Sequence, residues 1–129
     1  MIPEKQAAIE AIEAKRDVIT DVADHIWEYA ELSLQEEKSA ALYCEVLERE
    51  GFQVEKGICG IETAFSATYG SGRPLIGILA EYDALSGLSQ KAGSLTREEL
   101  VPGGCGHGCG HNLLGAGAMA AAIGIRAYL

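Results

Sequence analysis

Four potential metal ligands stand at alternate positions within residues 105–112 of the sequence. A glycine separates each neighbouring pair of the set, which consists of Cys105, His107, Cys109 and His111. Thiolate sulfur and imidazole nitrogen are groups that bind borderline-soft cations such as zinc. Because glycine has no Cβ, the backbone between these ligands can turn sharply enough to bring them onto one ion. The residue types and their spacing therefore predict a metal site.

The same run is compatible with two plainer structures. A closed structural zinc site would use all four side chains, but such sites usually have a wider spacing within each ligand pair and take the pairs from two separate places. A glycine-rich turn with reduced cysteines is the other alternative, since free cysteine is often buried. A redox pair is not expected, because Cys105 and Cys109 lack the Cys-x-x-Cys spacing. An open catalytic site is the favoured interpretation.

Two carboxylates follow the most apolar short run of the chain. Residues 75–80 carry no polar side chain, which predicts a strand buried on both faces, and Glu81 and Asp83 come directly after it. On their own they would be interpreted as solvated loop residues. Beside a metal site, a carboxylate can instead fix the tautomer of a ligating imidazole. We expect both carboxylates and the Cys/His run at the carboxyl ends of the strands, where ligands gather in α/β folds.

Periodic patterns predict the elements that position these side chains. Three helices are predicted, over residues 4–30, 36–50 and 113–129. Three short strands are predicted, over residues 52–55, 63–69 and 75–80. Gly51 is the expected stop of the second helix, and a polar loop over residues 86–104 leads to the Cys/His run. Helices followed by strands and a crossover helix predict an α/β fold, with N-terminal helices and a central sheet.

The last predicted helix has an unusual composition. Gly115, Gly117 and Gly124 lower its intrinsic helicity, so close packing against neighbours must hold it. No glycine, proline or polar tail follows it as a stop signal. We therefore expect the 129 residues to form part of a larger domain.

Charge and composition exclude several classes of protein. The net charge is −9, and residues 1–50 carry most of it, with 13 acidic and 5 basic side chains. No basic cluster indicates nucleic-acid binding. The longest apolar run without charges, residues 113–125, is too short to cross a bilayer, and the N-terminus has no signal-peptide pattern. Reduced cysteines are typical of the cytoplasm, where we expect this protein.

The sequence resembles the M20 metallopeptidase/amidohydrolase family, and within it the branch of aminobenzoyl-glutamate hydrolase B subunits. The resemblance rests on Gly-Ile-Leu-Ala-Glu-Tyr-Asp-Ala-Leu at residues 77–85 and on Gly-His-Gly-Cys-Gly-His-Asn at residues 106–112. The order of predicted elements matches as well, over nearly all 129 residues. It implies that residues 1–129 are the N-terminal portion of a zinc-peptidase-like catalytic domain, without its remainder and without the lid domain.

The resemblance implies metal-dependent hydrolysis of an amide bond. The substrate would be a small N-acyl amino acid, an aminobenzoyl-glutamate-like compound or a dipeptide. Cys109 and His111 would be metal ligands, and Asp83 would orient a metal-site residue. Three further residues would be neighbours of the site: Glu81, His107 and Asn112.

Two of these neighbours depart from the wider family. Glu81 stands where other branches carry a metal-binding histidine, so it is not assigned as a ligand. Asn112 stands where the wider family often has aspartate. The resemblance implies two divalent ions, either zinc or manganese, with cobalt or nickel as alternatives.

The general base would be one of two adjacent glutamates on a later strand of the family's domain. Residues 112–129 contain no Asp, Glu, Cys or His, so the 129-residue chain alone is expected to be inactive. A homodimer of the full-length protein would use contacts outside these residues. The alternative from another class is a non-catalytic metal-binding or interaction module derived from this family.

Overall fold

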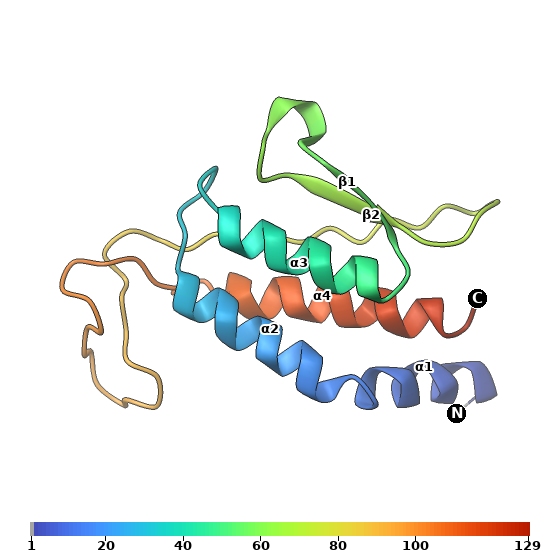
Figure 1. Ribbon diagram of the computed structural model, residues 1–129. Helices are drawn as coiled ribbons and strands as arrows, with labels where there is room; N and C mark the ends of the chain where they lie inside the picture. The colour runs from blue at the N-terminus through green and yellow to red at the C-terminus, as the bar shows by residue number, and fades with distance from the viewer. Residues whose placement is uncertain (1) are drawn as a thin grey trace.

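The computed structural model describes residues 2–129 and shows helices together with one small sheet (Figure 1). The helices are α1 (Pro3–Glu13), α2 (Arg16–Tyr29), α3 (Glu37–Arg49) and α4 (His111–Arg126). The strands β1 (Gln53–Lys56) and β2 (Phe65–Thr68) form an antiparallel hairpin around the 3-10 turn η1 (Ile58–Gly60). The mixed α/β content agrees with the prediction. The predicted central sheet is wrong for residues 2–129, where only these two strands pair.

The core lies where three helices meet. α4 packs against both α1 and α2, while α3 packs against α2 and carries the hairpin on its other side (Figure 1). The buried cluster consists of Val22, Ile26, Tyr43, Val46, Leu47, Phe52, Met119 and Ile123. Within the part of the chain that the structure describes, no helix combines the length and apolar character needed to cross a membrane.

The first predicted helix is interrupted. The prediction of one continuous helix over residues 4–30 is wrong, because α1 ends at Glu13 and α2 begins at Arg16. Lys15 leaves the helical conformation, with φ −109° and ψ 11°, and its ammonium nitrogen lies 2.7 Å from a carboxylate oxygen of Glu50. The break lets both helices lie against α4. Periodicity alone could not reveal it, since apolar residues continue on both sides.

Close packing holds α4, as its glycines predict. A Cβ on Gly124 would lie 2.8 Å from Cδ1 of Ile12, so the glycine lets α1 approach α4 closely. A Cβ on Gly115 would lie 2.3 Å from the hydroxyl oxygen of Tyr43. Gly117 faces open space, so the prediction is confirmed for two of the three glycines. The helix begins at His111, two residues earlier than predicted.

The predicted buried strand at residues 75–80 is wrong. The segment is extended, but its backbone forms no ladder with any part of residues 2–129, and Leu75 and Leu79 are 81% and 89% exposed. A Cβ on Gly115 would lie 3.1 Å from the carbonyl oxygen of Glu81, and one on Gly70 would lie 3.5 Å from Leu129. The chain from Gly70 to Glu81 therefore runs in the opposite direction to α4 (Figure 1). A strand needs hydrogen-bonded neighbours, and the described residues supply none here.

Candidate metal centre

Three side chains from two distant parts of the chain converge at the start of α4. One ligand atom from each of Glu81, Asp83 and His111 lies within 4.8 Å of the others. The Nδ1 atom of His111 lies 2.7 Å from Oδ1 of Asp83, and its Nε2 atom lies 3.3 Å from Oε2 of Glu81. The imidazole is thus flanked by one carboxylate at each nitrogen. Glu81 is exposed, whereas Asp83 and His111 are partly buried.

The arrangement determines which nitrogen of His111 is available to a cation. An ionised Asp83 carboxylate can only accept, so Nδ1 donates the hydrogen bond and carries the proton. In the neutral ring the lone pair is then on Nε2, which faces Glu81. Metal–ligand bonds of about 2.0–2.1 Å at a tetrahedral angle place two ligand atoms about 3.4 Å apart. The separation between Nε2 and Oε2 therefore fits two ligands of one ion.

The Asp83 side of the site is held by backbone pairing. The amide of Ala84 donates to the carbonyl oxygen of Glu31 at 2.7 Å, just after α2. Leu85 and Gly106 exchange two backbone hydrogen bonds, of 2.9 and 3.0 Å. The Leu85–Gly106 bonds join the segment that carries Glu81 and Asp83, here called the carboxylate segment, to the Cys/His run on the other side of the loop. A Cβ on Gly106 would lie 2.0 Å from the carbonyl oxygen of Leu88, so only glycine fits this crossing.

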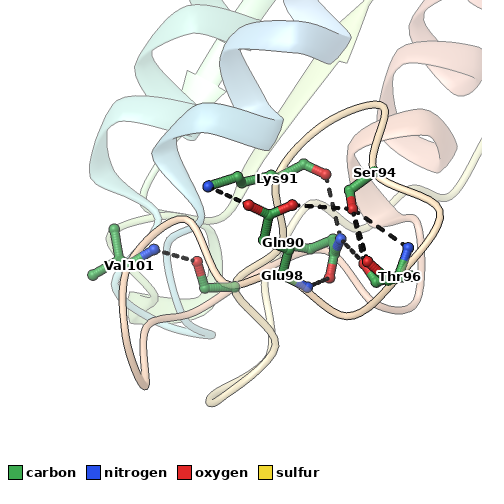
Figure 2. Close-up of polar contacts among 7 residues, drawn as sticks. Gln90, Lys91, Ser94, Thr96, Glu98 and Val101 are labelled. Atoms are coloured by element: carbon green, nitrogen blue, oxygen red, sulfur yellow. Dashed lines mark hydrogen bonds and ion pairs between the residues drawn. The ribbon is translucent and has the colours of Figure 1, made fainter.

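The predicted polar loop at residues 86–104 is folded on itself (Figure 2). The Gln90 amide donates to the carbonyl oxygen of Thr96 at 2.9 Å and accepts from the amide of Glu98 at 3.1 Å. The hydroxyl of Ser89 accepts from the amide of Val101 at 2.9 Å. The Ser89 amide donates to the carbonyl oxygen of Gly104 at 3.0 Å. These bonds close the base of the loop and return the chain to the carboxylate segment.

Gly110 sets the direction in which His111 enters the site. It is the N-cap of α4 and has φ 72°, a left-handed conformation that favours glycine. The amides of Leu113 and Leu114 both donate to its carbonyl oxygen at 3.0 Å. His111 is therefore the first helical residue, and the helix fixes its backbone while Asp83 fixes its ring.

The structure places two predicted neighbours of the site in the interior. His107 and Asn112 are each 5% exposed. The Nε2 atom of His107 donates to the carbonyl oxygen of Ile26 at 2.9 Å, and the Asn112 amide donates to that of Ala23 at 3.2 Å. Burial lowers the pKa of His107, which keeps its ring neutral near pH 7. Both residues thus bind helix α2.

The cysteines are not members of this group. Cys109 is exposed and Cys105 partly exposed, and neither belongs to the group that Glu81, Asp83 and His111 form. The structure therefore brings His111 together with Asp83 and Glu81, and Cys109 is not a member of this group. Sequence reasoning gave Glu81 no ligand role. The available signal was its spacing from Asp83, since residues i and i+2 of an extended segment share one face.

A histidine oriented by one carboxylate, with a second carboxylate close to its other nitrogen, is an arrangement that divalent-metal sites commonly use. The chain is 48% identical over 120 residues to the B subunit of the p-aminobenzoyl-glutamate hydrolase of Escherichia coli (strain K12). The match covers 93% of this chain but only 25% of the relative, so the chain spans a quarter of the relative's length. No family model matches the chain. The resemblance to the branch of aminobenzoyl-glutamate hydrolase B subunits is thereby confirmed over nearly all of these residues.

Proposed function

We propose that this chain supplies part of the divalent-metal centre of an amide-bond hydrolase. One observation carries the proposal: the His111 ring lies between Asp83, which accepts the hydrogen bond from Nδ1–H, and Glu81, whose carboxylate lies near Nε2. The 48% identity to a protein named as a hydrolase subunit supports the reaction class. The activity is proposed for the protein in which these residues are joined by those that supply the catalytic base.

His111 is the central ligand of the proposed centre, through Nε2. Glu81 is placed to share its ion, and Cys109 adds a thiolate from the exposed loop next to α4. Asp83 holds the tautomer and orientation of His111 through the bond to Nδ1. When bound, zinc or manganese supplies the Lewis acidity that polarises a carbonyl group and acidifies a water molecule.

The proposed substrate is a small molecule that contains an amide bond, such as an N-acyl amino acid, an aminobenzoyl-glutamate-like compound or a dipeptide. The support is the name of the Escherichia coli relative, which specifies a p-aminobenzoyl-glutamate hydrolase. That name also describes the relative as one subunit of a hydrolase, so a second subunit is a further proposed partner. A cytoplasmic location and a centre of two ions complete the proposal.

Metal binding by the purified chain is the first test. Isothermal titration with Zn²⁺ and Mn²⁺ should show a site that His111→Ala abolishes. His25→Ala is the matched control, because His25 is an exposed histidine on α2 outside the converging group. Equal binding by the two variants would contradict the proposed ligand.

Activity is the second test. Hydrolysis of p-aminobenzoyl-glutamate should be measurable in the full-length protein, should be lost in His111→Ala, and should be absent from the 129-residue chain. A full-length protein that binds metal through His111 but hydrolyses no amide substrate would support the non-catalytic metal-binding module instead.

A further inference from the structure

We propose that His107 is a positioning residue for the metal-binding imidazole of His111, through its hydrogen bond to helix α2. The inference rests on the function proposed for His111. It addresses how a glycine-rich loop, the most flexible kind of backbone, can present an imidazole at a fixed place.

His107 provides the buried side chain of this loop. Gly106, Gly108 and Gly110 have no side chains to pack, and Cys109 is exposed. His107, in contrast, is only 5% exposed. The loop between the Leu85–Gly106 backbone pair and the start of α4 is therefore anchored to the interior through one ring.

The partner of this ring is rigid. The carbonyl oxygen of Ile26 belongs to the last turn of α2 and also accepts from the amide of Ala30 at 3.2 Å. Ile26 itself is fully buried in the core, so this acceptor cannot move without disturbing the packing. The indole of Trp27 lies 6.4 Å from the His107 ring centroid, at 30°, and packs beside it. Helix α2 thus fixes both the position and the plane of the ring.

Asn112, the residue after His111, provides a second anchor to helix α2. Asn112 donates to the carbonyl oxygen of Ala23, which lies three residues before Ile26 on the same helix. His111 is therefore bracketed by two buried side chains that bind consecutive turns of α2. Loss of the His107 anchor would free the loop on one side, and the 2.7 Å contact between His111 and Asp83 would be kept for a smaller fraction of the time.

The test compares two substitutions that differ in one donor. His107→Leu fills similar volume without a donor, whereas His107→Gln places an amide N–H near the position of Nε2. Groups that orient a metal ligand typically change affinity by about 10–100-fold when they are lost. We expect His107→Leu to raise the Kd for Co²⁺ by about this factor and His107→Gln to stay close to wild type. Val46→Ala, a core substitution on α3, is the control for lowered stability alone.

A readout without metal separates this proposal from the proposed function. In the metal-free chain, the Nδ1–H proton of His111 should give a protected NMR signal because it is bonded to Asp83. The signal should be lost in His107→Leu and kept in His107→Gln and Val46→Ala. If no variant and no wild-type chain binds Co²⁺, the metal centre fails, and this signal still decides the role of His107.

Two results would overturn the positioning role. One is an unchanged Co²⁺ affinity and an unchanged His111 signal in folded His107→Leu. The other is an equal loss in the Leu and Gln variants, which would make the ring's shape, not its donor, the important property. If His107→Leu does not fold, His107→Asn replaces it, because its amide is too short to reach the Ile26 carbonyl oxygen.

Discussion

Alanine at position 115 is predicted to destabilise the chain, although alanine is the better helix former. In the interior of a helix, replacing glycine by alanine gains about 1 kcal/mol from backbone entropy. At Gly115 the new Cβ would lie 2.3 Å from the Tyr43 hydroxyl oxygen, 2.9 Å from its Cζ and 3.1 Å from the carbonyl oxygen of Glu81. Contacts under 3.0 Å require one partner to move, so the sign depends on whether Tyr43 can move.

Tyr43 has little freedom to move. It is 2% exposed, and its ring packs against Phe65 and Tyr82 at centroid distances of 6.3 and 5.3 Å. Overpacking in a core costs about 1–3 kcal/mol, and three close contacts with a ring and a backbone favour the upper end. After subtraction of the helix gain, Gly115→Ala should lower the free energy of unfolding by about 1–2 kcal/mol.

Gly117→Ala is the matched control on the same helix. A Cβ there meets nothing within 4 Å, so only the entropy gain remains and the free energy of unfolding should rise by about 0.5–1 kcal/mol. Urea unfolding followed by circular dichroism measures both variants. Tyr43→Phe removes the nearest clashing atom and should recover part of the loss in the double variant with Gly115→Ala. A midpoint for Gly115→Ala at or above wild type would refute the packing argument.

Three further predictions concern charge, surface and metal. Glu50→Gln should cost about 2–3 kcal/mol, because the 8%-exposed carboxylate loses charged bonds to Lys15 and Arg126 at 2.7 and 2.9 Å. Burial raises the pKa of Glu50, but the two cations outweigh burial and hold this pKa below its usual value of 4.5. The ionised carboxylate therefore stabilises the fold above pH 4.5, and this stabilisation is lost as the pH falls through the lower pKa of the folded state. Thermal unfolding from pH 6 to pH 3 should show the stabilities of the wild type and Glu50→Gln converging. Leu79→Lys should reduce self-association in light scattering with little change in stability, since this side chain is 89% exposed. Asp83→Asn should weaken Zn²⁺ binding by about 10–100-fold in calorimetry, because the amide leaves the His111 tautomer unfixed.

Local patterns predicted the helices well, and the reason is that their signals are local. The span of α3 and its stop at Gly51 follow from apolar spacing and one glycine, which has φ 86°. The start of α3 was predicted within one residue, but the contact that stabilises it was not. Its N-cap, Glu36, makes no capping bond, and the carboxylate of Glu31 instead accepts from the amides of Lys38 and Ser39 at 2.9 and 2.8 Å.

The candidate site was predictable in its residues more than in its geometry. The motifs led us to expect Asp83 to orient a residue of a metal site, but only the structure identifies His111 as its partner and Glu81 as the carboxylate at the other ring nitrogen. The interior roles of His107 and Asn112 depend on carbonyl groups more than eighty positions earlier, at Ile26 and Ala23. A histidine in a run of ligands carries no local signal that its bond goes to a distant helix.

The segment that ends α2 organises both halves of the site without contributing any ligand. The carbonyl groups of Ala23 and Ile26 accept hydrogen bonds from the side chains of Asn112 and His107, and these bonds hold the loop that carries His111. The carbonyl oxygen of Glu31 accepts a hydrogen bond from the amide of Ala84, which holds the segment that carries Asp83. The Glu31 carboxylate accepts from a backbone amide in the first turn of α3. One short stretch therefore sets the distance between an imidazole and a carboxylate that stand far apart in the sequence. Changes that tilt the last turn of α2 should alter metal affinity through this frame, even where every ligand is kept.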